Sequence, residues 1–372
     1  MKIGITCYPT YGGSGVVATE LGMKLATMGH QVHFISYALP YRLSNFTTNV
    51  YFHEVDVLQY PLFEYPPYSL SLAHKMAEVI EFEKLDILHV HYAIPHATSA
   101  HLAKEILEDK GFKFVTTLHG TDITLIGSDP SYLKIVKFSI EKSDGVTAVS
   151  KYLADKTYQT FNVKNEIEVI PNFVPDKFLE LDITKRDFCY KKSNEIIMTH
   201  ISNFRPLKRV TDLVYVMEKL VKKNTHIRLL MVGDGPDRAR MEMLCREMNL
   251  CDHITFLGKQ ENVENVLASS DLFLLPSAEE SFGLAVLEAL ACGVPCVTTN
   301  AGGLPEVNIH GETGFNVNIG DIDAFADAVY EIISDRQVAK KFSENARILA
   351  SEKYGSDKIV PQYLDYYSKI IS

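Results

Sequence analysis

Two glutamates, Glu280 and Glu288, flank the point where a loop becomes a helix in the sequence PSAEESFGLAVLEALACGVP, which starts at Pro276. The apolar run Leu272–Leu275 before it is typical of a buried strand, and the closing glycine and proline are typical of a helix end. This order brings the free N–H groups of the first helical turn to the carboxyl edge of a sheet, where a phosphate group can bind. Because carboxylates accept hydrogen bonds from hydroxyls, the stretch predicts a site for a phosphorylated sugar. A capped helix with two solvated acids is the alternative interpretation.

A second group of residues suited to chemistry is cationic. Arg205, Lys208 and Arg209 lie within five residues, between an expected strand and the helix that follows it. Guanidinium and ammonium groups at the carboxyl end of a strand can neutralise a diphosphate. A run of charged residues is also typical of a solvated helix face, but the position of these three cations between a strand and a helix favours a diphosphate-binding site.

The first residues predict a strand–helix–strand unit: a strand over 2–7, a glycine-rich turn over Tyr11–Gly15, a helix over 16–28 and a strand over 31–36. Glycines in such a turn let the backbone approach a ligand. The turn does not match GxGxxG, and no acid ends the second strand to hold a ribose. A dinucleotide-binding fingerprint is therefore unsupported, and a plain tight turn is the alternative.

Histidines gather after two further expected strands. His89, His91 and His96 lie in and after the strand over 86–91, with no carboxylate close in sequence to complete a zinc site. Satisfied polar side chains at a strand end are therefore favoured over a metal site. His119 and Asp122 follow the strand over 114–118, where ligands bind in such folds. Asp122 as the cap of the next turn is the equally weighted alternative.

The rest of the chain continues the alternation of strands and helices. Residues 171–176 contain two prolines and predict a hinge, and a loop over 37–67 with the cation Arg42 is expected near a binding cleft. The remaining strands are expected at 49–55, 145–148, 166–170, 195–200, 227–232, 254–257, 272–275 and 296–299. This alternation predicts an α/β fold of two doubly wound domains.

Composition limits the function classes. The 372 residues are 46% hydrophobic and 23% charged, which are globular values, and their number favours two domains. No apolar run approaches the ~20 residues that span a bilayer, and the first residues lead directly into a strand without a signal peptide. The six cysteines form no CxxC pair, so we expect reduced thiols and a cytoplasmic protein. A net charge of −10 argues against nucleic acid or a membrane surface as partner, but not against a small anion.

Together these motifs resemble retaining glycosyltransferases of family 4, which have the GT-B fold of two Rossmann-like doubly wound domains facing a cleft. The resemblance covers essentially the whole chain. It rests on the glycine turn, His119 with Asp122, Lys208, the sequence GDGP from Gly233, and above all the two glutamates with seven residues between them. Most relatives carry an arginine five residues before the lysine. That position is Asn203 here, and Arg205 lies three residues before Lys208.

The resemblance implies an acceptor-binding domain over 1–170 plus 356–372, where the last segment returns as a helix over 356–371, and a UDP-sugar-binding domain over 171–355. It implies catalytic roles for Arg205, Lys208, Glu280 and His119. It implies donor-binding roles for Gly13, Gly233, Phe282, Gly283, Leu284 and Glu288. The residues expected at the acceptor are Ser14, Tyr92, Thr117, Asn172 and Arg205.

Within the family, HVHYAIPHATSA, LHGTDITLIG and ISNFRPLKR resemble the segments of members that transfer N-acetylglucosamine from UDP-N-acetylglucosamine to L-malate, the first step of bacillithiol biosynthesis. Retention by front-face attack, without metal or cofactor, is then implied, and double displacement through two close carboxylates is the alternative mechanism. The alternatives are another acceptor such as inositol phosphate or a lipid, a non-catalytic sugar-nucleotide-binding protein, and a dehydrogenase of similar fold. Homo-oligomerisation stays open.

Overall fold

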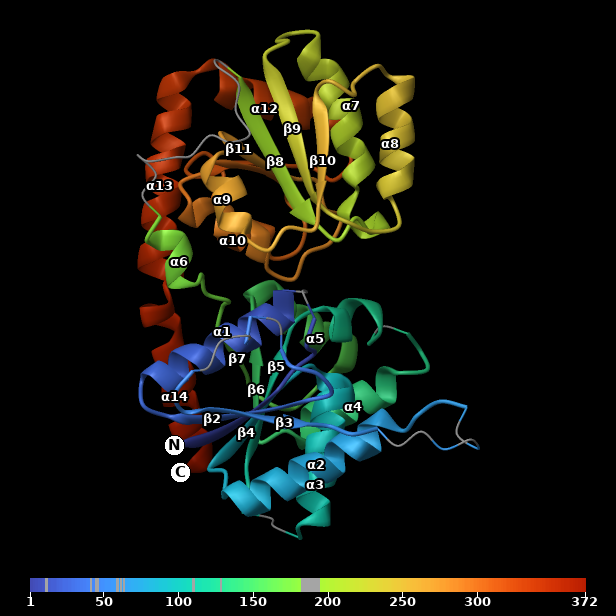
Figure 1. Ribbon diagram of the computed structural model, residues 1–372, viewed down its shortest axis with the longest axis vertical. Coiled ribbons are helices and arrows are strands. Elements are labelled where there is room, and N and C mark those ends of the chain that lie inside the picture. The colour runs from blue at the N-terminus through green and yellow to red at the C-terminus, as the bar shows by residue number, and fades with distance from the viewer. Residues whose placement is uncertain are drawn as a thin grey trace. The chain divides into compact units, whose positions relative to one another are not determined.

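The computed structural model divides the chain into two compact units. Unit 1 comprises residues 1–172 and 356–372, and unit 2 comprises residues 173–355 (Figure 1). The structure describes all residues except 11–12, 41, 44–46, 58–59, 61, 63, 109–110, 128 and 182–194. The boundaries expected from the sequence lie within two residues of these, and the expected hinge over 171–176 spans the first of them.

Unit 1 contains a seven-stranded sheet of order β3-β2-β1-β4-β5-β6-β7, in which neighbouring strands are parallel. Its strands are β1 (Lys2–Thr6), β2 (Gln31–Ser36), β3 (Val50–Glu54), β4 (Ile87–His91), β5 (Phe114–Leu118), β6 (Gly145–Ala148) and β7 (Ile167–Val169). Its helices are α1 (Gly13–Thr27), α2 (Tyr68–Glu83), α3 (Thr98–Ile106), α4 (Leu133–Lys142), α5 (Lys151–Phe161) and α14 (Ser356–Ile371), with short helical turns η1 (Ala93–Ala97) and η2 (Thr121–Leu125).

Unit 2 repeats the plan with a six-stranded parallel sheet of order β10-β9-β8-β11-β12-β13. Its strands are β8 (Ile196–Ser202), β9 (Ile227–Gly233), β10 (Ile254–Gly258), β11 (Leu272–Leu275), β12 (Cys296–Thr299) and β13 (Gly314–Val317). Its helices are α6 (Asp176–Leu179), η4 (Pro206–Lys208), α7 (Val210–Val221), α8 (Arg238–Glu247), α9 (Val263–Ala268), α10 (Leu284–Ala291), α11 (Leu304–Val307), α12 (Ile322–Ser334) and α13 (Arg336–Tyr354).

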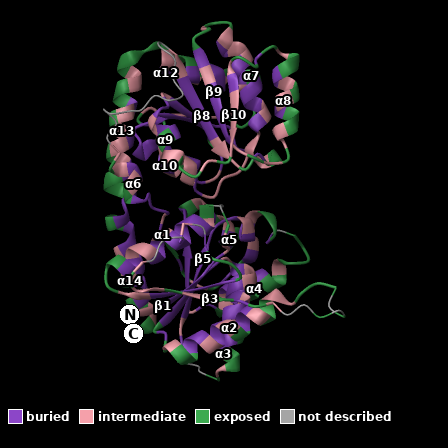
Figure 2. Ribbon diagram, in the orientation of Figure 1, coloured by how far each residue is buried: buried purple, intermediate pink, exposed green. Residues whose placement is uncertain are grey.

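The central strands of both sheets are buried, the edge strands are more exposed, and the helices expose their outer sides (Figure 2). In unit 2, apolar side chains of α7, α8 and α12 pack with alternate strand residues such as Leu229 and Met231, and Leu230 and Val232 pack with α9 on the opposite face. Each fully buried aliphatic side chain contributes about 1.5–3 kcal/mol to the stability of the fold. Helices on both faces therefore hold this sheet as a rigid support of the unit.

Helix α14 packs on unit 1, far in sequence from the rest of that unit, and spans the range expected for it. The Tyr366 hydroxyl accepts a hydrogen bond from the Val146 N–H at 2.9 Å and donates to the Val146 carbonyl at 3.1 Å. Tyr367 reaches His89 of β4 at 2.6 Å. These buried polar contacts fix the rotation of the helix on the sheet, which apolar packing alone does not specify.

Two expectations were wrong in detail. The expected glycine turn over Tyr11–Gly15 ends earlier, because Gly13 already belongs to α1; Tyr11 and Gly12 lie outside the described residues. The expected sheet of unit 2 lacked β13, a four-residue edge strand that is half-buried and contains Asn316, so its apolar signal is short. Among the described residues, no helix is both long and apolar enough to cross a membrane.

Replacing Tyr366 by Phe should lower the free energy of unfolding by about 1–3 kcal/mol, because the backbone groups of Val146 lose a buried partner. Urea unfolding followed by far-ultraviolet circular dichroism would measure the change. Tyr132→Phe is the matched control, since Tyr132 is 46% exposed, and should change stability by less than about 0.5 kcal/mol. Equal stability of both variants would contradict a stabilising role for this contact.

Candidate functional site

In each sheet the order of strand addition reverses once, between β1 and β4 in unit 1 and between β8 and β11 in unit 2. The loops that leave the carboxyl ends of those two strands diverge to opposite faces, so ligands bind at this point in open α/β sheets. The predicted catalytic cations and Glu280 follow β8 and β11, while Ser14 and Tyr92 follow β1 and β4. Residues that are 72 or 78 positions apart in sequence are thereby brought together.

At the reversal in unit 2, the Lys208 ammonium donates to Glu280 Oε1 at 2.6 Å, and both side chains are more than four-fifths buried. Ser277 donates to the same oxygen at 2.9 Å. Because both bonds go to Oε1, Oε2 can accept a hydrogen bond from a hydroxyl group. The arrangement holds a cation and a hydrogen-bond acceptor side by side, and a sugar that carries phosphate needs both.

Backbone contacts fix the loop that carries Glu280. The Ala278 N–H donates to the Leu207 carbonyl at 2.7 Å, and the Gly303 N–H donates to the Glu280 carbonyl at 2.9 Å. A Cβ on Gly303 would lie 2.4 Å from the Ser281 carbonyl oxygen, so a glycine is required there. Sequence alone did not identify Ser277 and Gly303 as site residues, because an isolated serine or glycine does not indicate a role until its contact partner is known.

Helix α10 begins directly after this loop. Gly283 precedes its first residue and has a φ of 97°, a conformation that L side chains rarely adopt, and a Cβ there would lie 2.6 Å from Leu304. Phe282 is buried and anchors the loop. Helix α10 therefore begins four residues after Glu280, and a phosphate site at its first turn stays a prediction.

The other predicted residues of unit 2 lie at or after the carboxyl ends of β8, β9 and β11. Glu288 is 7% exposed on α10, and Arg205 is exposed at the start of η4, where its carbonyl accepts from the Lys208 N–H at 2.8 Å. Gly233 ends β9 with a φ of 120°, and a Cβ there would lie 1.8 Å from the Ser202 carbonyl oxygen. Glycine at that position thus lets the ends of β8 and β9 approach closely.

At the reversal in unit 1, the hydroxyls of Ser14 and Tyr92 lie 2.7 Å apart. Ser14 belongs to the first turn of α1, a turn without acidic side chains, so its free N–H groups and the helix dipole favour an anion. Tyr92 has a φ of 89°, and its N–H donates to the Thr117 carbonyl at 2.9 Å. Burial raises the pKa of Tyr92 to about 12, which keeps its hydroxyl protonated and able to donate.

Asp122 connects the two loops of this edge. Its carboxylate accepts from the Ala93 N–H at 2.8 Å and from the Gly120 N–H at 3.0 Å, and the side chain is 1% exposed. Burial raises its pKa to about 6. Asp122 therefore does not cap the turn that follows it, since η2 has no side-chain cap. Its contacts instead join the segments that carry Tyr92 and His119.

The histidines of unit 1 form a buried network. His119 Nε2 lies 2.7 Å from His91 Nδ1, and the His119 ring is 5.4 Å from that of Tyr92. His89 contacts the hydroxyls of Thr117 and Tyr367, both at 2.6 Å. The interpretation of these histidines as hydrogen-bonded side chains of a strand end agrees with these contacts.

Two predicted acceptor residues lie differently from Ser14 and Tyr92. Thr117 is fully buried, and its hydroxyl contacts His89 and Thr147, so only its carbonyl takes part at this edge. Asn172 is the last residue of the first stretch of unit 1, is 6% exposed, and its side-chain oxygen has no hydrogen-bond partner among the described residues. Arg42 pairs with Glu20 of α1 at 2.9 Å.

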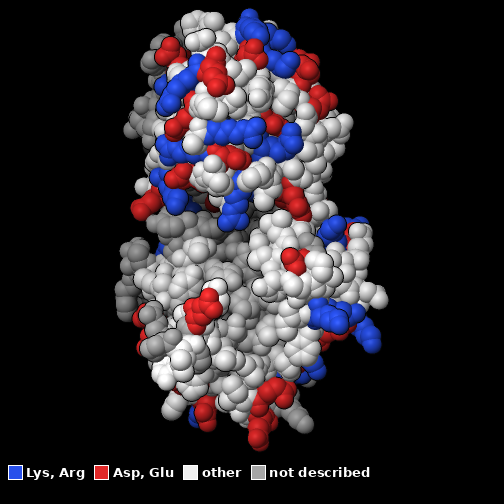
Figure 3. Space-filling view, turned by 90° about the vertical axis from the view of Figure 1, so that its right-hand side faces the viewer, with Lys and Arg blue, Asp and Glu red and all other residues white. Residues whose placement is uncertain are grey.

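Figure 3 shows cationic and anionic side chains interspersed over unit 2, whereas unit 1 carries few charges on the same view. Several cations of unit 2 are in ion pairs, including Lys223 with Asp327 at 3.0 Å and Arg238 with Glu242 at 2.9 Å. The face in view has no extended surface of one sign of the kind that binds nucleic acid or anionic lipid.

Comparisons with known proteins divide the chain at the same place. A family model described as glycosyl transferases group 1 matches residues 183–349, and one described as Glycosyltransferase Family 4 matches residues 11–178. Over 374 aligned residues the chain is 49% identical to N-acetyl-alpha-D-glucosaminyl L-malate synthase of Bacillus anthracis, with 100% of this chain and 97% of the relative covered.

Solved structures share the whole fold. Anabaena HepE in complex with UDP-glucose has a TM-score of 0.83 at 20% identity, covering 99% of this chain and 100% of its own. Sucrose-phosphate synthase from Thermosynechococcus elongatus has a TM-score of 0.82 at 22% identity, covering 100% and 99%. At these identities the likeness concerns the fold, and it confirms the expected pair of doubly wound α/β domains.

Buried histidines predict how stability depends on pH. Burial lowers the pKa of His89 and His119 to about 3 and that of His96 and His200 to about 4. Since the unfolded chain then binds more protons between pH 6.5 and 4, the free energy of unfolding should fall as pH falls through this window, by up to about 1.4 kcal/mol per pH unit and group. Asp122 makes a contribution of opposite sign, because its raised pKa stabilises the folded state as pH falls from 6 to 4. This single contribution opposes those of several histidines.

Urea unfolding at pH 7.5 and pH 5.5 would measure this loss. His119→Gln should reduce the loss, whereas His226→Gln, which changes an exposed imidazole, should leave it unchanged. A free energy of unfolding that is constant over the interval, or that rises towards pH 5.5, would contradict the prediction.

Proposed function

The chain belongs to glycosyltransferase family 4 and has the GT-B fold, and from this membership we propose that it transfers N-acetylglucosamine from UDP-N-acetylglucosamine to the hydroxyl group of L-malate. The protein is a glycosyltransferase. The observation that carries the choice of donor and acceptor is the 49% identity over the full chain to the Bacillus anthracis enzyme of that name.

The donor half of the proposal uses unit 2. The diphosphate of the nucleotide sugar meets the backbone N–H groups of Phe282, Gly283 and Leu284, which lead into α10, and the cations Lys208 and Arg205. Glu288 accepts from the ribose hydroxyls, and Glu280 Oε2 accepts from a sugar hydroxyl. Gly233 gives the backbone room at the end of β9.

In the proposed reaction, the bond between the sugar C1 and the β-phosphate oxygen breaks, and the malate hydroxyl oxygen bonds to C1 on the same face. The hydroxyl proton passes to the phosphate oxygen that leaves. Negative charge therefore grows on the β-phosphate, and Lys208 and Arg205 stabilise that charge more strongly in the transition state than in the bound substrate. This scheme requires no carboxylate nucleophile and no metal.

The acceptor half uses unit 1. L-Malate carries two carboxylates at neutral pH, so its site needs hydrogen-bond donors. The Ser14 and Tyr92 hydroxyls and the first turn of α1 provide such donors at one point of the sheet edge. His119 lies against Tyr92, and in the proposal it contacts the sugar or the acceptor. Gly13 opens the same turn and lies against the diphosphate in the proposal, while acceptor contacts of Thr117, Asn172 and Arg205 stay predictions.

Lys208→Ala and Arg205→Ala should lower kcat by about 100- to 1,000-fold while weakening donor binding much less, because the charge that they meet is largest in the transition state. Calorimetric titration with UDP-N-acetylglucosamine gives donor affinity, and UDP release gives turnover. Lys223→Ala is the control, since Lys223 pairs with Asp327 on the outside of unit 2. If affinity collapses while turnover of the bound complex stays normal, these cations only hold the substrate.

L-Malate should be a better acceptor than L-lactate by at least about tenfold in kcat/KM, because lactate leaves donors of the site unpaired. Tyr92→Phe should raise the KM for malate about tenfold or more, since a hydrogen bond to a charged group contributes about 1.5–3 kcal/mol, and should leave the KM for the donor nearly unchanged. Tyr132→Phe again serves as the control.

Release of UDP, measured with malate, lactate, inositol phosphate and a lipid acceptor in turn, tests both statements. Equal kcat/KM for malate and lactate would overturn the dicarboxylate assignment and leave a glycosyltransferase with another acceptor. Tight donor binding without UDP release to any of these would favour a sugar-nucleotide-binding protein.

A further inference from the structure

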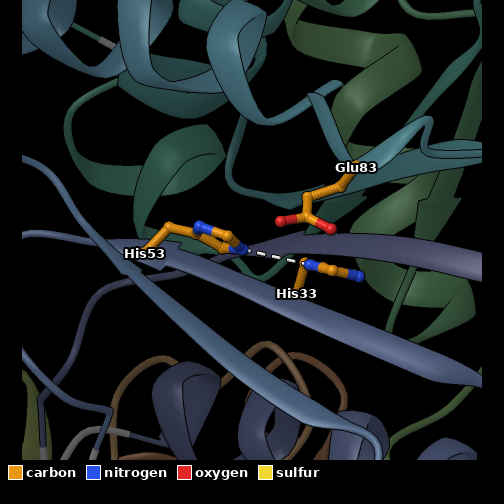
Figure 4. Close-up of side chains that lie close together, drawn as sticks. All are labelled: His33, His53 and Glu83. Carbon is orange, nitrogen blue, oxygen red and sulfur yellow. Dashed lines mark hydrogen bonds between the residues drawn. The ribbon is translucent and has the colours of Figure 1, made fainter. Parts of the chain in front are cut away.

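Three potential metal ligands come together in unit 1 outside the sites described above. His33 lies in β2, His53 in β3, and Glu83 is the last residue of α2. Each can offer one ligand atom such that all three atoms lie within 4.8 Å of one another. Figure 4 shows the Glu83 carboxylate directed at the two imidazoles, which face each other.

Sheet register explains this meeting. His33 pairs with Tyr51 and Ile35 pairs with His53, so the two histidines are diagonal neighbours on one face of the parallel pair β2–β3. Ile35 packs with Leu72, Met76 and other side chains of α2 on that same face. Helix α2 thus covers the histidines and ends where Glu83 can reach them.

The geometry suits a small divalent cation. His33 Nδ1 and His53 Nε2 lie 3.0 Å apart. Two nitrogens bound to one tetrahedral zinc ion at about 2.0–2.1 Å are separated by about 3.3 Å, so a small rotation of either ring admits the ion. His33 is 1% exposed, and its Nε2 has no hydrogen-bond partner among the described residues. The tautomer with its proton on Nε2 leaves the Nδ1 lone pair directed at His53, where the ion replaces the hydrogen bond between the two rings.

The electrostatic surroundings agree with this. The Lys2 ammonium donates to the Glu83 backbone carbonyl at 2.8 Å, not to the carboxylate that would bind the ion, and Lys75 pairs with the Glu78 carboxylate at 2.7 Å.

We propose that His33, His53 and Glu83 bind one zinc-class divalent cation, which fastens the edge strand β3 to β2 and to the end of α2. Two histidines and one glutamate form a known zinc ligand set, and water completes the coordination, since His53 and Glu83 are only partly buried. None of the three residues belongs to the segments that carry Ser14, Tyr92 or His119. The cation is structural and takes no part in glycosyl transfer.

The test uses full-length protein stripped with a chelator and titrated with Zn²⁺ by calorimetry. The unaltered protein should bind one equivalent. Glu83→Gln, which keeps the shape of the side chain, and His53→Ala should each weaken binding beyond the 10- to 100-fold loss typical of a missing outer-shell partner. His101→Gln is the control, because His101 lies on α3, where it contacts Glu105 at 4.0 Å and packs against the Phe138 ring, away from the three proposed ligands.

Zinc should also raise the thermal midpoint of the unaltered protein and of His101→Gln, but not that of the two ligand variants. Chelation should leave the initial rate of UDP release at 25 °C unchanged, so the outcome is independent of the proposed reaction. Zinc binding that is equal in all variants would come from elsewhere, such as the exposed Cys251, and would overturn the proposal. Absence of binding would reduce the cluster to a hydrogen-bonded histidine pair.

Discussion

The reversal of strand order in each sheet is the constraint on which both proposed half-sites depend. Right-handed crossovers place successive helices on one face of a sheet until the chain starts again on the other side of its first strand. At that point two neighbouring loops turn away from each other, and backbone N–H groups and side chains are left without a covering element. Lys208 with Glu280, and Ser14 with Tyr92, occupy these points, so the same topology serves two different sets of ligand-binding groups.

The sequence was sufficient for the alternation of elements and for single motifs, because buried parallel strands are short apolar runs and helix ends carry glycine or proline. It was not sufficient to predict which residues contact each other. Lys208 and Glu280 could each be assigned to a phosphate-binding loop, but their contact depends on which strands are neighbours. Likewise, the sequence left open whether Asp122 faces a ligand or caps a turn, and the two N–H groups that reach it come from different loops.

The register in which two strands pair is a second property that a local sequence pattern does not predict. His33 and His53 appear in the sequence as unremarkable members of two strands, and a shift of the pairing by one residue would send them to opposite faces. By contrast, the conspicuous histidines His89, His91 and His96 are distributed among separate partners. Proximity of histidines along the chain therefore does not show which of them converge in space, as ligands of one ion must.

Helix α14 has a consequence for biosynthesis. Unit 2 is one continuous segment, whereas unit 1 is completed only by a helix encoded after the whole of unit 2. During synthesis unit 2 can therefore fold as it leaves the ribosome, while the larger part of unit 1 waits with the His89 and Val146 contacts of its sheet unmade. The chain of unit 1 is thus begun first, but unit 2 is the first of the two units to be complete. A nascent chain stalled before residue 356 would expose that uncovered face to chaperones.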